Sequence, residues 1–103
     1  ETPKNLDELE HIFQMYTIKL TSKKIRDDLH ENLLNKKIFS KVYFNPIHLT
    51  TSFKEKFGTS KGMLPITEKI SETVLTLPLY PNMTNEEKEY LIESIIEFFE
   101  TQN

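Results

Sequence analysis

The sequence predicts an α+β domain, in which a small antiparallel or mixed β-sheet has helices packed on one face. Segments rich in β-branched and aromatic residues alternate with segments whose apolar residues recur every three or four positions. The first two predicted strands are joined through a helix and not by a tight hairpin turn. The chain of 103 residues has the length of one domain.

The composition narrows the classes of function. The formal net charge is −3, so the chain has no basic excess for binding nucleic acid. It contains no cysteine, which excludes disulfides, a thiol nucleophile and a thiolate metal site. No apolar run in the sequence approaches the roughly 20 residues of a membrane-spanning helix. The chain starts at Glu1 and not at Met, and we expect it to be a piece of a longer protein.

The first half of the chain begins with a predicted strand over residues 11–20, because β-forming and apolar residues dominate this stretch. A helix is predicted over residues 22–37, with Thr21 or Ser22 as its N-cap. Its apolar stripe consists of Ile25, Leu29 and Leu33, with Leu34 beside them.

Three further elements follow. Residues 38–45 are predicted to form a second strand, which Pro46 ends because proline has no N–H to donate. Residues 51–57 predict a short helix, and Gly58 suits the left-handed position after it. The next helix begins near Pro65. Its predicted apolar stripe consists of Ile66, Ile70 and Val74.

The end of the chain combines a short extended run with the clearest helix. Residues 75–81 lie between and around two prolines, which favours extended backbone. Thr84 and Glu87 have the spacing of a capping box, so the last helix begins there. Its predicted apolar face consists of Leu91, Ile92, Ile95, Ile96 and Phe99.

The polar residues match no pattern of catalysis or metal binding. None of the three histidines has a second ligand at metal-binding spacing, and Leu34 occupies the position four residues after His30. His30 is expected on a solvated helix face. Arg26 is expected to form a local ion pair with Asp27-Asp28, which contributes little if solvent reaches it. The sequence therefore predicts no catalytic residue and no metal ligand.

One segment combines aromatic, amide and imidazole groups at the end of a predicted strand. Its residues are Tyr43, Phe44, Asn45, Pro46 and His48. Such groups on a stiff loop are typical of ligand sites. The alternative is a structural interpretation, in which the two rings divide between core and surface and the imidazole caps a turn. Composition and spacing alone favour this structural interpretation.

Residues 38–49 resemble the G-I-x-T-x-V-H-Y-x-P-x-H-L stretch of the DegT/StrS-type sugar aminotransferases. Other pieces occur in the family's order. Arg26-Asp27-Asp28-Leu29 is similar to the family's R-D-x-L helix, and residues 74–84 are similar to its V-L-S-L-P-L-x-P-x-M-T signature. The resemblance extends from about Tyr16 to Phe99.

The resemblance implies a C-terminal small domain, spanning residues 1–103, of a pyridoxal-phosphate enzyme of the aspartate aminotransferase fold type. The parent enzyme transfers an amino group from an amino acid to a keto-sugar nucleotide, in polysaccharide, glycan or antibiotic sugar biosynthesis. The cofactor residues belong to the N-terminal large domain, which this chain lacks. We therefore expect the chain alone to hold no cofactor and to be inactive.

The implied partners are the chain's own large domain, the second subunit of a homodimer and a nucleotide sugar. No nucleic acid or membrane is expected, and the expected location is the cytoplasm. The apolar residues expected to face the large domain are Phe13, Met15, Phe53 and Met63. The alternative is a stand-alone α+β binding or assembly module that shares only the fold.

The substrate-binding candidates follow from the resemblance. The family's V-H-Y-x-P-x-H region lies near the mouth of the active site, and the matching positions are Tyr43, Phe44 and His48. Tyr43 stands where the family usually has histidine, and Phe44 stands where it usually has tyrosine. Phe44 therefore lacks a hydroxyl that could bond to a substrate, whereas His48 matches the family.

Overall fold

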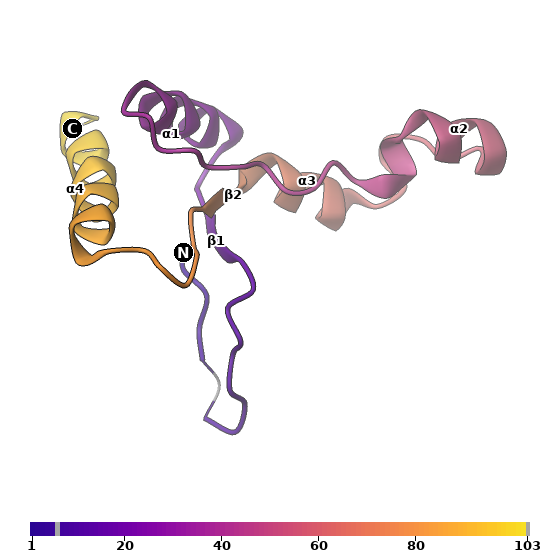
Figure 1. Cartoon of the computed structure of the whole chain (residues 1–103). Helices are drawn as coiled ribbons and strands as arrows, with labels where there is room; N and C mark the ends of the chain where they lie inside the picture. Colours follow the sequence, from indigo (N-terminus) through magenta and orange to yellow (C-terminus); the bar gives the residue numbers. More distant parts are fainter. Residues whose placement is uncertain (6, 103) are drawn as a thin grey trace.

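The computed structural model describes residues 1–5 and 7–102 (Figure 1). The elements in order are β1 (Tyr16–Lys19), α1 (Lys23–Asn35), the 3-10 helix η1 (Ile47–Leu49), α2 (Thr51–Phe57), α3 (Pro65–Thr73), β2 (Val74–Leu77) and α4 (Asn85–Thr101). Within these described ranges, β1 and β2 form a two-stranded antiparallel sheet. The predicted α+β class is confirmed, and the small sheet, predicted as antiparallel or mixed, is antiparallel.

Strand β1 is shorter than the predicted residues 11–20. It pairs only with β2, with Tyr16 opposite Leu77 and Lys19 opposite Val74, so the short partner limits its length. Residues 1–5 and 7–15 belong to an arm that extends from the body (Figure 1). This arm folds back at its start, where the Glu1 amino group donates to the Lys19 carbonyl at 2.8 Å.

The core is centred on helix α1. The Ser22 side chain accepts from the Ile25 backbone N–H at 3.2 Å, which confirms the predicted N-cap. Leu29 and Leu33 are fully buried, in one cluster with Leu75 of β2. Leu34 is 48% exposed, so its predicted place beside the stripe is wrong.

The predicted second strand over residues 38–45 is wrong. The segment meets β2 at an isolated bridge between Lys41 and Thr76. Two backbone hydrogen bonds form this bridge, at 2.8 and 2.7 Å. Phe39 and Phe44 on either side are exposed. A sequence that suits a strand therefore remains irregular, because only one residue lies in register with β2.

Helix α2 matches its predicted bounds, and Gly58 ends it with a φ of 64°. None of its residues is buried. The helix lies at the far end of the molecule from α4 (Figure 1). Residues 46–64 thus form a projection that depends on a few specific contacts for its position.

The apolar faces of the last two helices differ from the predicted ones. In α3, Ile66 is 75% exposed and Ile70 is 45% exposed. Helix α4 begins with the predicted capping box of Thr84 and Glu87. It buries Leu91, Ser94 and Phe98 and leaves Ile92 and Ile96 exposed. The buried hydroxyl of Ser94 marks the side of α4 that packs against the rest of the domain.

No helix in the described ranges has the length and apolar character needed to cross a membrane.

Candidate functional site

Tyr43 and Phe44 line a groove of about 640 Å³. Helix α3 forms its opposite wall with the exposed Ile66 and Ile70. The remaining lining residues are Asn45, Pro46, Ile47, Thr50, Thr67, Ser71 and Val74. The groove therefore combines aromatic and aliphatic surfaces with hydroxyl and amide groups, a common composition for a binding site.

The two aromatic rings of the groove lie together. Their centroids are 4.8 Å apart, within the range of favourable aromatic contacts. The Lys41 ammonium lies 5.7 Å from the centroid of the Tyr43 ring, at cation–π distance. Phe44 is 66% exposed and Tyr43 is half-buried. Both rings are thus accessible to a partner or ligand.

His48 lies outside the lining of this groove. The residue is buried, and its Nε2 lies 2.9 Å from Oε1 of Glu68 on α3. An ionised carboxylate only accepts hydrogen bonds, so Nε2 carries the proton. Thr59 Oγ1 donates to the His48 carbonyl at 2.6 Å. His48 therefore fastens η1, next to the groove, to helix α3.

Glu68 gathers the loop that precedes its own helix. Its two carboxylate oxygens accept from the Gly62 backbone N–H at 2.8 and 3.0 Å, and Oε1 lies 3.4 Å from the Leu64 N–H. The hydrogen bond from His48 is the main cause that lowers the pKa of Glu68; burial opposes it, and the two amides add to the lowering. Sequence reasoning missed Glu68, because no periodic spacing relates it to His48.

Arg26 has a larger role than the predicted local ion pair. It is only 5% exposed, and its Nη1 donates to the carbonyls of Ser71 at 3.2 Å and Val74 at 3.3 Å. Its Nε also donates to Asp27 at 2.6 Å. The guanidinium thus joins α1 to the end of α3 and the start of β2, which fixes one wall of the groove.

His30 was expected on a solvated face, and this expectation is wrong. The residue is half-buried, and its Nδ1 lies 2.8 Å from the hydroxyl of the buried Ser40. The contact connects α1 to the segment that precedes the groove. No group of three or more potential metal-binding side chains occurs within residues 1–5 and 7–102.

The four apolar residues expected to face a large domain do not form one patch. Phe13 and Met15 belong to the arm before β1, and the Phe13 ring stacks on Tyr16 with centroids 6.2 Å apart. Phe53 contacts Phe57 within α2. Met63 is 55% exposed in the loop before α3. The arm and α2 project from different sides of the sheet (Figure 1), so these residues occupy separate surfaces.

Comparison with known proteins identifies the family. The sequence profile of the DegT/DnrJ/EryC1/StrS aminotransferase family matches residues 1–96. The chain belongs to this family. Among similar proteins, the "Pleiotropic regulatory protein" of Geobacillus stearothermophilus is 36% identical over 99 residues, covering 95% of this chain and 26% of the relative. The GDP-perosamine synthase of Escherichia coli O157:H7 is 30% identical over 89 residues, covering 86% of this chain and 23% of the synthase.

Solved structures agree with this assignment. A DegT DnrJ EryC1 StrS aminotransferase from Brucella abortus aligns with a TM-score of 0.80 and 25% identity, covering 95% of this chain and 26% of that one. The aminotransferase TlmJ from Streptoalloteichus hindustanus aligns over 100% of this chain and 27% of its own, with a TM-score of 0.85. At 19% identity, that similarity shows the fold alone. The chain spans about a quarter of the length of these relatives and solved structures.

Aminotransferases of this family depend in general on pyridoxal phosphate. The groove at Tyr43 does not fit that cofactor by itself. Its described lining contains no lysine to hold the aldehyde carbon and no carboxylate to pair with the ring nitrogen. The described lining of the groove thus supplies neither the lysine nor the carboxylate that the cofactor needs.

Proposed function

We propose that this chain is the C-terminal small domain of a nucleotide-sugar aminotransferase. Such an enzyme moves an amino group from an amino acid to a keto-sugar nucleotide and serves the synthesis of polysaccharide, glycan or antibiotic sugars. The observation that carries the proposal is the family match over residues 1–96. Two named relatives support the substrate class, the GDP-perosamine synthase and a dTDP-3-amino-3,4,6-trideoxy-alpha-D-glucose transaminase.

The role proposed for this domain is to form one wall of a substrate cleft. Tyr43 and Phe44 present aromatic faces, which suit stacking against a sugar ring or a base. The hydroxyls of Thr67 and Ser71 lie on the opposite wall and can hydrogen-bond to sugar hydroxyls. His48 acts as a positioning residue, because its contact with Glu68 holds η1 against α3.

The cofactor chemistry is assigned to the partner domain. Pyridoxal phosphate supplies an electron sink for the amino transfer when bound. The proposed partners are an N-terminal large domain of the same enzyme, a second subunit of a homodimer and the nucleotide sugar, in the cytoplasm. On this proposal the 103-residue chain alone binds no cofactor and catalyses no transfer.

A chimeric enzyme tests the proposal. Residues 1–96 replace the matching segment of the Escherichia coli GDP-perosamine synthase, and amino transfer to its keto-sugar substrate is measured. We expect measurable activity, with Tyr43→Ala and Phe44→Ala raising KM for the nucleotide sugar. Phe57→Ala, which alters an exposed ring outside the groove, is the matched control and is expected to leave KM unchanged. A folded dimeric chimera without activity would favour the stand-alone module instead.

The isolated chain gives a second test. Mixed with pyridoxal phosphate, it is expected to show no absorption band of a lysine-bound cofactor. A band that disappears when one lysine of this chain is replaced would contradict the assignment of cofactor binding to the partner domain.

A further inference from the structure

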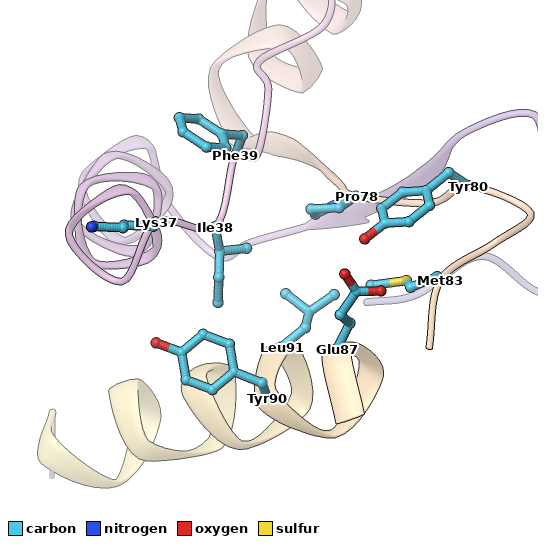
Figure 2. Close-up of a pocket in the computed structure, with 9 residues that line it drawn as sticks. All are labelled: Lys37, Ile38, Phe39, Pro78, Tyr80, Met83, Glu87, Tyr90 and Leu91. Carbon is cyan, nitrogen blue, oxygen red and sulfur yellow. The ribbon is translucent and has the colours of Figure 1, made fainter. Parts of the chain in front are cut away.

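A second cavity lies on the side of the domain near α4. Its volume is about 390 Å³, within the range of small-molecule sites. Ile38 and Leu91, both buried, form its floor. Pro78 and Met83 add apolar surface, and the cavity lies between the end of α1, the residues after β2 and the first turns of α4 (Figure 2). Residues far apart in sequence thus enclose one apolar space.

Three aromatic rings border this cavity. Phe39, Tyr80 and Tyr90 come from three separate segments, and each contributes to the lining of the cavity (Figure 2). A hydrogen bond holds one of the rings: the Tyr90 hydroxyl donates to the Lys36 carbonyl at 3.2 Å. The Tyr90 ring is therefore positioned before any ligand arrives, which lowers the cost of binding.

The charge at the cavity is negative on its inner side. Glu87 directs its carboxylate into the space toward Tyr80, whereas Lys37 directs its amine away from it (Figure 2). The hydrogen bond from the Thr84 backbone N–H is the main cause that lowers the pKa of Glu87, and the bond from Tyr80 adds to it. The carboxylate is therefore ionised at neutral pH and favours a cationic ligand over an anionic one.

We propose that this cavity binds the alkylated ammonium group of a small organic cation. Aromatic faces attract such cations electrostatically, and the free-energy cost of removing water is smaller for an alkylated ammonium than for a bare one. The apolar floor contacts the alkyl groups, and Glu87 supplies the opposite charge. The cavity shares no lining residue with the groove of Tyr43 and Phe44, so this inference is independent of the proposed function.

Choline and its neutral carbon isostere dimethylbutanol are the probes. Each is titrated into the 103-residue chain at fixed ionic strength, with amide chemical shifts recorded by NMR. We expect saturable shifts centred on residues 37–39, 78–83 and 87–91. Choline is expected to bind at least about threefold more tightly than the isostere, which is the size of a partly exposed cation–π contribution.

Two variants with matched controls separate specific binding from general attraction to a negative protein. Phe39→Leu is expected to weaken choline binding about two- to fivefold, whereas Phe57→Leu, at an exposed ring outside the cavity, is expected to have no effect. Glu87→Gln keeps the capping acceptor and removes the charge. It is expected to weaken choline binding and leave the isostere unaffected, whereas Glu86→Gln on the same helical turn changes neither.

Three results would each overturn the proposal. The first is equal affinity for choline and dimethylbutanol, which would mean that the cavity recognises only apolar shape. The second is an equal loss of choline binding in Glu86→Gln and Glu87→Gln, which would indicate general electrostatic attraction. The third is a set of choline-induced shifts outside the cavity residues.

Discussion

Replacing Arg26 by methionine tests how much of the stability of the domain depends on one buried guanidinium. Methionine keeps most of the apolar stem but cannot donate to the carbonyls of Ser71 and Val74, at 3.2 and 3.3 Å in the native protein. Each hydrogen bond from a charged donor contributes about 1.5 kcal/mol at the low end of its range, so the two together contribute about 3 kcal/mol.

Relief of the cost of burying the charge offsets part of this loss, by about 1 kcal/mol. The contact with Asp27 adds little, because that carboxylate is 50% exposed. The free energy of unfolding is therefore expected to fall by about 2 kcal/mol, which corresponds to a decrease in Tm of about 10 °C for a domain of this size.

Unfolding of the 103-residue chain by guanidinium chloride, followed by far-UV circular dichroism, measures this change. Lys24→Met is the matched control. Lys24 forms an exposed pair with Asp28 on the same helix, and its loss is expected to cost only about 0.3–0.5 kcal/mol. Arg26→Lys is expected to fall between the two, because a single ammonium cannot reproduce the planar fork. Equal stability losses for Arg26→Met and Lys24→Met would refute this reasoning.

Three further predictions concern stability. The folded-state pKa of Glu68 lies below the ordinary value of 4.5, so the ionised carboxylate stabilises the fold fully above that pH, and this stabilisation is lost as the pH falls through the folded-state pKa. Glu68→Gln is therefore expected to flatten the fall in unfolding free energy at acid pH, measured by urea titrations at several pH values. An unchanged dependence of the unfolding free energy on pH would speak against the contact with His48. Lys37 has a left-handed φ of 61°, so Lys37→Gly is expected to raise the free energy of unfolding by about 0.5–1 kcal/mol in denaturant melts, the strain relieved exceeding the added backbone entropy. Leu29 is 0% exposed, so Leu29→Ala is expected to lower the free energy of unfolding by about 2–5 kcal/mol, and a loss below 1 kcal/mol in calorimetry would place Leu29 outside the core.

The elements predicted accurately are those whose ends are determined by local chemistry. The Ser22 side chain caps α1 by accepting from the backbone N–H of Ile25, three residues later. Thr84 and Glu87 satisfy each other's backbone N–H groups at the start of α4. Gly58 ends α2 because only a residue tolerant of positive φ fits there at low cost. Each of these signals lies within one helical turn, so the sequence contains the whole interaction.

The errors concern elements that depend on distant partners. Residues 38–45 have the composition of a strand, but β2 offers them a single paired position, at Thr76. Ile66 and Ile92 belong to apolar stripes that a helix should bury, yet both stay exposed in this chain. Periodicity identifies an apolar face but cannot indicate which neighbour covers it.

The candidate site shows the same division. The resemblance of residues 38–49 to the family identifies Tyr43 and Phe44, and both line the groove. The partner of His48 lies 20 residues away on another helix, at no spacing that a single sequence makes recognisable. The roles of Tyr43, Phe44 and His48 in substrate binding remain predictions, which the chimera can test.

The sheet has a consequence for how the chain is made. Thr17 of β1 and Thr76 of β2 bond through their hydroxyls, although they are 59 residues apart. During synthesis β1 leaves the ribosome long before β2, so the backbone groups of β1 that pair with β2 have no partner until α1, α2 and α3 have followed. Helix α1 can form locally in that interval, but its apolar stripe has no β2 to pack against. The core of the domain therefore cannot finish packing until the residues from Val74 onward have been synthesised. A ribosome that stalls before Val74 would leave Leu29 and Leu33 exposed to chaperones.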